Sequence, residues 1–240
     1  MSEWFTRWFG REYLEIYPHR DEAEARRVVR MIRNTIDLDP DGRALDLACG
    51  SGRHVRALNK HVWTVGLDLS MDLLKIAMAE SPGTSFVRAD MRDLPFARSS
   101  LDLVVNLFTS FGYFSSDEEN RMVLSEVSRV LKCGGTFVID YLNADHVRAA
   151  LVAHDSQKVG SRMVTQDRRI TADGRYVEKV ISAPGLPRPF LERVRMFEPE
   201  DLRCLLHDAG FTIHHELGDY DAAPLTLDSP RAIFFAQRSC

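Results

Sequence analysis

The chain has 240 residues, of which 45% are hydrophobic and 28% are charged, as in an ordinary globular protein with one sizeable core. The formal net charge of −4 argues against a nucleic-acid partner, so we expect a small-molecule partner instead. No apolar tract is long enough to span a bilayer, and the amino terminus "MSEWFTRWFGREY" lacks a secretory signal. These features predict one domain over residues 1–240 in a cytoplasmic protein without a membrane partner; they do not predict its oligomeric state.

The first predicted elements alternate between helix and strand. "DEAEARRVVRMIRNTI" has apolar residues at helical spacing, with Asp21 as the expected cap, and forms part of an amino-terminal helical cap over residues 1–40. Alternation of this kind is typical of a parallel sheet with helices on both faces. The following elements are expected: strand 43–48, a helix from Gly52, strand 62–68, helix 70–80, strand 84–89, strand 101–108, helix 117–131 ended by the glycines of 133–135, and strand 135–141.

The pattern changes between residues 155 and 198. "RMVTQDRRI" and "RYVEKVIS" flank Asp173-Gly174, which predicts a hairpin turn, and "RPFLERVRMF" is expected to add a third antiparallel strand. A helix over 199–209 and strands in 211–220 and 231–238 then resume the winding. The sequence therefore predicts a Rossmann-like, doubly wound, mostly parallel seven-stranded α/β sheet, with a small antiparallel insertion between strands five and six over the substrate pocket.

Three acids and a glycine loop mark one edge of this sheet. Asp46, Asp68 and Asp90 lie at or just after the ends of the first three strands, each 22 residues from the next. Gly50 and Gly52 follow the first strand and allow a ligand to approach the backbone before a helix begins. An acid after the second strand suits a ribose diol, so the set predicts an adenosine-type cofactor. Taken singly, each glycine could be a tight turn and each acid a helix cap.

Three motifs carry a resemblance to the class I S-adenosylmethionine-dependent methyltransferases, over about residues 40–142 and the last two strands. They are "DLACGSG", "GLDLS" and "ADMRDLPF". The resemblance implies S-adenosylmethionine as cofactor and S-adenosylhomocysteine as product. Ala48 stands where many members have glycine. The implied cofactor-binding residues are Asp46, Ala48, Gly50, Ser51 and Gly52 at the methionine moiety, Asp68 at the ribose, Asp90 at the adenine amino group, and Leu69 and Met91 against the adenine ring.

The tract "NLFTSFGYFSSDEE" follows the fourth strand, where this family contacts the sulfonium and the acceptor. The chain resembles, in particular, the small-molecule N-methyltransferases that act on amino sugars and related amines. Those enzymes tend to have histidine at the position of Tyr113. Tyr113 is therefore expected to orient the acceptor, and the sequence does not identify a general base. The remaining implied residues are Asn106 and Leu107 at the methionine end, Tyr17 and Arg20 closing the cofactor site, and Phe108, Phe111, Tyr113, Tyr141 and Arg193 at the substrate.

The expected function is transfer of a methyl group to an amine or hydroxyl of a small molecule by direct in-line displacement. A nicotinamide-dependent oxidoreductase fits less well, because its fingerprint needs glycine or alanine where Val55 stands. A cofactor-binding protein without catalysis stays an alternative. The widely spaced Cys49, Cys133, Cys204 and Cys240 are expected to be free thiols, and no metal site is expected.

Overall fold

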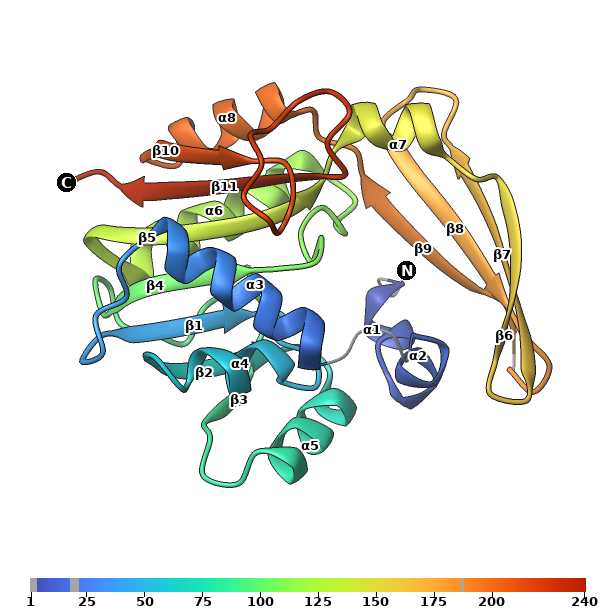
Figure 1. Cartoon of the computed structure of the whole chain (residues 1–240), viewed down its shortest axis with the longest axis horizontal. Coiled ribbons are helices and arrows are strands. Elements are labelled where there is room, and N and C mark those ends of the chain that lie inside the picture. Colours follow the sequence, from blue (N-terminus) through green and yellow to red (C-terminus); the bar gives the residue numbers. More distant parts are fainter. Residues whose placement is uncertain (1–3, 18–21, 187) are drawn as a thin grey trace.

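The computed structural model describes residues 4–17, 22–186 and 188–240 and contains two sheets (Figure 1). The seven-stranded sheet has the order β10-β11-β5-β4-β1-β2-β3, in which β11 runs antiparallel to both of its neighbours and the other pairs are parallel. Helices cover both faces of this sheet, and the smaller sheet stands to one side with the amino-terminal helices between them. The predicted doubly wound fold with an antiparallel insertion is confirmed.

The elements of the larger sheet lie close to their predicted bounds. Expected and observed ends differ by a few residues, as strand and helix ends do in general. The elements are α3 (Glu22–Thr35), β1 (Arg43–Leu47), α4 (Arg53–Leu58), β2 (Trp63–Asp68), α5 (Met71–Glu80), β3 (Phe86–Arg88), β4 (Leu101–Asn106), α6 (Asp117–Val130), β5 (Leu131–Leu142), α8 (Pro199–Asp208), β10 (Phe211–Leu217) and β11 (Arg231–Arg238).

Local side-chain chemistry explains where the helix after β4 begins and ends. Ser116 and Glu119 form a capping box at the start of α6. The helix ends at Val130 because Leu131 is extended, with ψ 144°, and opens β5. The expected glycine cap at 133–135 is therefore wrong, since those glycines lie inside β5. The expected cap of α3, Asp21, lies outside the described residues.

The insertion is larger than the sequence predicts. It is a four-stranded antiparallel meander in the order β6-β7-β8-β9, preceded by a short helix, α7. Three strands were expected, but a fourth, the polar strand β6, pairs along the edge of β7. Its alternation of polar and apolar residues is too weak to predict a strand from the sequence. The amino-terminal cap also contains two further helices. These elements are α1 (Phe5–Trp8), α2 (Arg11–Ile16), α7 (Ala144–Ala150), β6 (His154–Val159), β7 (Arg162–Ile170), β8 (Tyr176–Ser182) and β9 (Phe190–Arg195).

Two cysteines that were expected to be free thiols form a disulfide. Cys133 and Cys240 are 107 residues apart in sequence, yet their Cα atoms lie 4.9 Å apart and their sulfurs are bonded. Antiparallel pairing of β11 with β5 matches Gln237 with Thr136, and so brings the carboxyl-terminal residue to the start of β5. Cys49 and Cys204 are free, as expected.

Within the described ranges, no helix combines the length and the apolar character needed to cross a membrane.

Candidate cofactor and acceptor site

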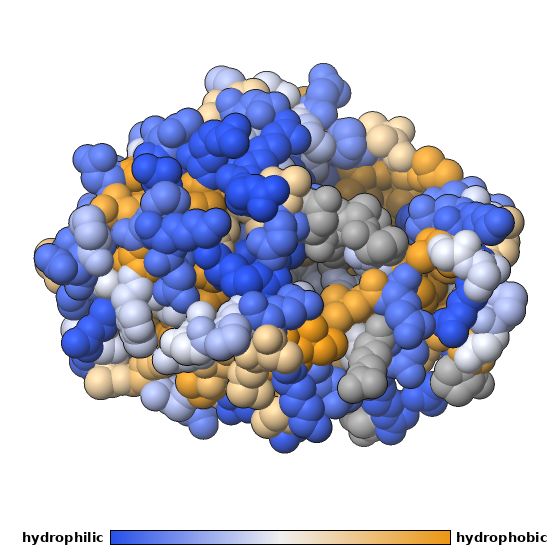
Figure 2. Space-filling model, turned by 60° about the horizontal axis from the view of Figure 1, so that its bottom comes forward, coloured by the Kyte–Doolittle hydropathy of each residue, from blue (hydrophilic) through white to orange (hydrophobic). Residues whose placement is uncertain are grey.

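A cavity of about 430 Å³ lies where β1, β2 and β3 end, and α1 and α2 form its opposite wall. Figure 2 shows hydrophobic side chains set back in a hollow beside the grey atoms, with hydrophilic side chains over much of the surrounding surface. Seven of the predicted site residues line the cavity, from all three strand ends and from the segment after β4. They are Ala48, Gly50, Asp68, Leu69, Asp90, Met91 and Tyr113.

Asp68 ties the glycine loop to the end of β2. Asp68 is 9% exposed, and its carboxylate accepts hydrogen bonds from the backbone N–H groups of Gly50 and Ser70, both at 2.8 Å. Burial raises the pKa of Asp68, while these hydrogen bonds favour its charged form. Each carboxylate oxygen has a second lone pair, so Asp68 can also accept hydrogen bonds from a ligand in the cavity.

The loop itself needs left-handed backbone at three positions. Ala48, Gly50 and Gly52 have φ values of 64°, 56° and 78°. A Cβ atom on Gly52 would lie 2.9 Å from the ring of Phe86, so only glycine fits there without a shift of that ring. Ala48, which departs from the family's usual glycine, adopts the same left-handed conformation, and the loop forms despite the departure.

Two buried acceptors lie at the ends of the neighbouring strands β1 and β4. Asp46 and Asn106 are each 1% exposed, and Oδ2 of Asp46 and Oδ1 of Asn106 lack a hydrogen-bond partner among the described residues. Burial raises the pKa of Asp46 to about 7, against the attraction of Arg53. Unsatisfied buried acceptors are rare in proteins, so both positions suit a ligand that donates hydrogen bonds or carries positive charge. Neither residue is among those that line the cavity.

Asp90 is held in place by one arginine. Arg92 donates from its backbone N–H and Nε to Oδ1 and from Nη2 to Oδ2 of Asp90, at 2.7 to 3.0 Å, and it also pairs with Glu119. Burial alone would raise the pKa of Asp90, but the hydrogen bonds from Arg92 lower it below its ordinary value. Asp90 therefore stays ionised as an acceptor, with Leu69 and Met91 beside it in the cavity wall.

Tyr113 reaches the cavity from the turn that follows β4. Its ring stacks on Phe9, with 5.6 Å between centroids, and meets Trp4 edge-on at 5.0 Å. Phe108 and Thr109, which open this turn, both have a φ of 59°, a strained value for residues with side chains. The turn thus places an aromatic phenol against the amino-terminal helices.

Three aromatic residues predicted at the substrate do not line the cavity. Phe111 and Tyr141 are at most 1% exposed and pack against each other in the core, where burial raises the pKa of Tyr141 and its hydroxyl donates to the carbonyl of Arg195. Phe108 lies on the other face of the sheet, where Arg53 sits 4.2 Å from its ring centroid. Sequence alternation alone could not separate core aromatics from pocket aromatics in this tract.

Arg193 and Tyr17 are also placed away from the cavity. Arg193 lies opposite Glu178 in the strand register and stacks over Tyr176 at 3.9 Å. This face of the small sheet is opposite to that of Lys179, which contacts Tyr17 just after α2. Tyr17 is buried and donates from its hydroxyl to Glu192 at 3.0 Å. Burial, reinforced by Glu192, raises its pKa. Arg20 lies outside the described residues.

The amino-terminal helices supply a wall that the sequence did not predict in detail. Most of the side chains in this wall are aromatic or charged. The composition of the segment "WFTRWFGREY" is visible in the sequence, but it does not indicate which face of the helices lines the cavity. The unpredicted lining residues in this wall include Phe5, Arg7, Phe9 and Glu12.

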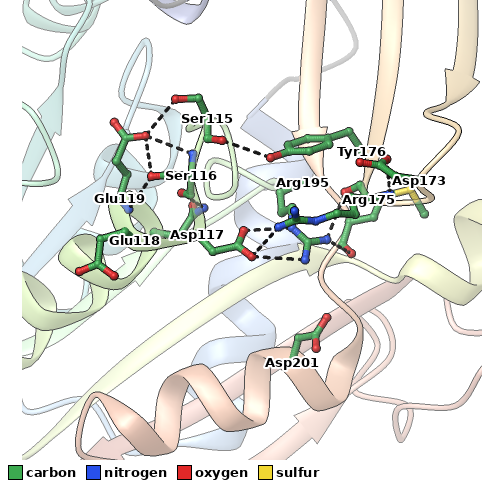
Figure 3. Close-up of polar contacts among 12 residues, drawn as sticks. Ser115, Ser116, Asp117, Glu118, Glu119, Asp173, Arg175, Tyr176, Arg195 and Asp201 are labelled. Carbon is green, nitrogen blue, oxygen red and sulfur yellow. Dashed lines mark hydrogen bonds and ion pairs between the residues drawn. The ribbon is translucent and has the colours of Figure 1, made fainter.

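A largely buried acidic side chain, Glu192, links this wall to the insertion. Glu192 on β9 accepts hydrogen bonds from Trp8 Nε1 at 2.7 Å and Tyr17, and it pairs with Lys179 at 2.5 Å. We call α1, α2 and β6–β9 together the roof. The roof also contacts helix α6 beside the larger sheet, where Arg195 pairs with Asp117 at the start of α6 at 3.0 Å (Figure 3).

No cluster of three or more histidine, cysteine or acidic side chains that could hold a metal ion occurs in the part of the chain that the structure describes.

Comparison with known proteins identifies the family. A family model described as a methyltransferase domain matches residues 44–135. The chain is 30% identical over 197 residues to the dTDP-3-amino-3,4,6-trideoxy-alpha-D-glucopyranose N,N-dimethyltransferase of Streptomyces venezuelae, over 79% of this chain and 78% of the relative.

Solved structures agree with this match. The fold matches an S-adenosylmethionine-dependent methyltransferase from Clostridium acetobutylicum with a TM-score of 0.80 at 19% identity, over 95% of this chain and 98% of that one. The sugar N-methyltransferase KedS8 from a Streptoalloteichus species matches with a TM-score of 0.70 at 25% identity, over 95% of this chain and 92% of that one. The predicted resemblance is confirmed, and the chain belongs to the S-adenosylmethionine-dependent methyltransferases.

Proposed function

We propose that this enzyme methylates the amine of a small, sugar-like molecule in the cavity between the ends of β1–β3 and the roof. The observation that carries this proposal is the likeness to the amino-sugar N,N-dimethyltransferase, whose chain is matched over most of its length. S-adenosylmethionine, when bound, supplies a methyl group on a positively charged sulfur. Membership of this family leaves no ground for the oxidoreductase alternative.

The residues at the strand ends fit this cofactor. Asp68 would accept hydrogen bonds from the ribose, and Asp90 from the adenine amino group between Leu69 and Met91. The buried oxygens of Asp46 and Asn106 without partners favour a donor at the methionine end, where the cofactor carries an ammonium group. Leu107, Ser51 and Gly52 would shape this end of the site.

The charge of the cavity favours a cationic cofactor and a basic acceptor. Four carboxylates and two guanidinium groups occur among its described lining residues, which are Glu12, Asp68, Asp72, Asp90, Arg7 and Arg88. A cavity with this excess of negative charge attracts cations. The stacked rings of Phe9 and Tyr113 add aromatic surface of the kind that also favours cations.

Methylation would proceed by direct displacement, in which a nitrogen–carbon bond forms as the sulfur–carbon bond breaks and S-adenosylhomocysteine leaves. The nitrogen must be uncharged to react, so its proton has to be lost to solvent or to a nearby group. Tyr113 would orient the acceptor by hydrogen bonding, and alignment of the reacting atoms would provide most of the rate enhancement.

Two measurements, made one after the other, test this function. Isothermal titration should show saturable binding of S-adenosylmethionine and S-adenosylhomocysteine, but not of NAD. Incubation with S-adenosylmethionine and amino-sugar nucleotides, beginning with the substrate named for the Streptomyces relative, should then yield S-adenosylhomocysteine and a product bearing one or two added methyl groups by mass spectrometry. Cofactor binding without turnover on any amine would favour the non-catalytic alternative.

A further inference from the structure

Asp140 is a fully buried carboxylate at the end of β5, and its partners surround the turn after β4. It is 0% exposed and accepts hydrogen bonds from the Phe108 N–H at 2.9 Å, the Tyr220 hydroxyl at 2.8 Å and Nε of Arg231 at 2.7 Å. We call Asp140, Tyr220 and Arg231 the Asp140 cluster. Its members come from β5, the β10–β11 loop and β11, and none of them lines the cavity.

The Asp140 cluster holds both strained residues of the turn. Besides the contact to Phe108, the carbonyl of Asp140 accepts the Thr109 N–H at 2.9 Å, and Nη2 of Arg231 donates to Oγ1 of Thr109 at 2.9 Å. Threonine is branched at Cβ, so its φ of 59° is especially unfavourable. Such a conformation persists only when its surroundings fix it, as they do here.

Stability alone does not explain this arrangement. A buried ion pair is often no more stabilising than apolar residues of the same size, and two left-handed residues with side chains also oppose folding. The strained turn at 108–109 leads directly to Ser110 and Tyr113 in the cavity wall. Strain of this kind clusters at functional sites in proteins.

We propose that Asp140, Tyr220 and Arg231 are positioning residues, which hold the turn at 108–109 so that Ser110 and Tyr113 face the methyl acceptor. This inference rests on the proposed function, because it gives the turn a role toward the acceptor rather than toward the cofactor. The Asp140 cluster acts through the backbone of the turn and does not touch the reacting atoms.

Kinetics of two variants test the role. Tyr220→Phe removes one hydrogen bond to Asp140, and Arg231→Lys removes the contact to Thr109 while keeping the charge. With the acceptor found by the screen above, we expect kcat to fall about 10-fold in Tyr220→Phe and about 100-fold in Arg231→Lys, with KM for the cofactor changed by less than about threefold. An unchanged kcat in a folded Arg231→Lys variant overturns the proposal.

Arg27→Ala is the matched control. It breaks an ion pair with Asp221, which belongs to the same β10–β11 loop as Tyr220 but is exposed and does not contact the turn. We expect this variant to keep the wild-type kcat. An equal loss of kcat in Arg27→Ala would show that any loosening of the loop suffices, and would overturn the specific role of the Asp140 cluster.

A double variant separates positioning from stability. Glycine adopts a positive φ without strain, so adding Thr109→Gly to Tyr220→Phe should restore the melting temperature. If the Asp140 cluster positions the turn, kcat should stay low in the double variant. Recovery of kcat together with the melting temperature would mean that the cluster only stabilises the fold, and would overturn the proposal.

One readout does not depend on an acceptor. The indole Nε1–H of Trp4 donates to the carbonyl of Tyr113 at 3.3 Å, so its NMR resonance reports the position of the turn. We expect this resonance to shift in Tyr220→Phe and Arg231→Lys but not in Arg27→Ala. A shift without any methylated product would count against the proposed function while supporting the positional role of the cluster; an unmoved resonance would overturn that role.

Discussion

The strand ends that would hold the cofactor and the roof above them are built from different kinds of contact. At the strand ends, Asp68 binds backbone groups of Gly50 and Ser70, which lie 18 and 2 residues away in sequence. In the roof, Glu192 binds Trp8 and Tyr17 across 184 and 175 residues. The strand-end side of the candidate site is therefore fixed by contacts within and between neighbouring βα units, whereas the roof side depends on contacts between distant segments.

The largest effect is expected from Glu192→Ala, which would break the roof and spare the strand ends. This change removes the ion pair with Lys179 and the hydrogen bonds from Trp8 and Tyr17 in a largely buried place, and should lower the free energy of unfolding of α1 and α2 by about 3 kcal/mol. Hydrogen exchange should show faster exchange in residues 4–17, with little change in β1–β3.

Glu15→Ala is the matched control for that variant. Glu15 pairs with Arg162 at 2.9 Å and joins the same two segments, but both side chains are about half exposed. Exposed pairs contribute little, so we expect a loss below about 0.5 kcal/mol. Equal losses in the two variants would refute the assignment of Glu192 as the main fastening.

Asp68→Ala changes the strand ends, and we expect it to leave the contacts of the roof intact. Loss of the ribose acceptor and of the loop contacts should weaken binding of S-adenosylhomocysteine about 100-fold, measured by isothermal titration. Asp72→Ala, at an exposed lining residue, should change affinity by less than about threefold. Retained affinity in Asp68→Ala would mean that the ribose lies elsewhere.

Asp46 should make the stability of the protein depend on pH through a group at the strand ends. The folded protein keeps the Asp46 proton up to pH about 7, whereas an unfolded chain releases it near 3.8, so the folded state binds more protons in between. This group therefore makes stability fall as pH rises from about 4 to about 7. Asp46→Asn should remove that slope and be about 2 kcal/mol more stable than the wild type at pH 8.

In Asp46→Asn, cofactor affinity should fall although the stability of the ligand-free protein rises. If Asp46 meets the cationic methionine end, Asp46→Asn should weaken cofactor affinity even as it stabilises the protein without ligand. Thermal melts with and without S-adenosylhomocysteine across this pH range measure both effects. A variant that is stabilised and binds the cofactor normally would remove Asp46 from the site.

Apart from the control variants, the smallest effect is expected from Arg193→Ala, on the face of the small sheet opposite to Glu192 and Lys179. It removes a guanidinium group stacked on Tyr176, which should cost about 0.5–1 kcal/mol of stability in thermal melts. Glu178 keeps its pair with Arg169. Because Arg193 lies on the face away from α2, KM for the acceptor should stay the same; a large rise in KM would restore the predicted substrate role.

Several residues of the candidate site could be placed from the sequence because their surroundings are encoded by nearby residues. Asp68 and Asp90 follow buried strands, and the parallel arrangement of those strands brings their ends to one edge. Leu69, Met91 and Gly50 then follow from their position next to the acids. The same logic placed Asp46 and Asn106 at strand ends, where the structure finds them buried with unpartnered oxygens.

The aromatic tract and the roof could not be resolved in the same way. Phe111, Tyr113 and Phe114 are all aromatic, and only packing decides that Phe111 is enclosed in the core while Tyr113 and Phe114 also reach the cavity. Tyr17 was expected at the cofactor, but its hydroxyl forms hydrogen bonds with Glu192 and Lys179 in the roof, which are distant in sequence. The disulfide likewise depends on the pairing of β11 with β5, which the spacing of the cysteines does not reveal.

The sequence by itself determined the α/β fold, the cofactor class and the acids at the strand ends, because hydrophobic periodicity and short turns encode βα units locally. Tertiary structure decided which aromatic side chains face the cavity, how the roof is fastened, and how the Asp140 cluster holds the turn after β4. These features arise from contacts between segments up to 184 residues apart, and the pattern around each segment does not identify its distant partner.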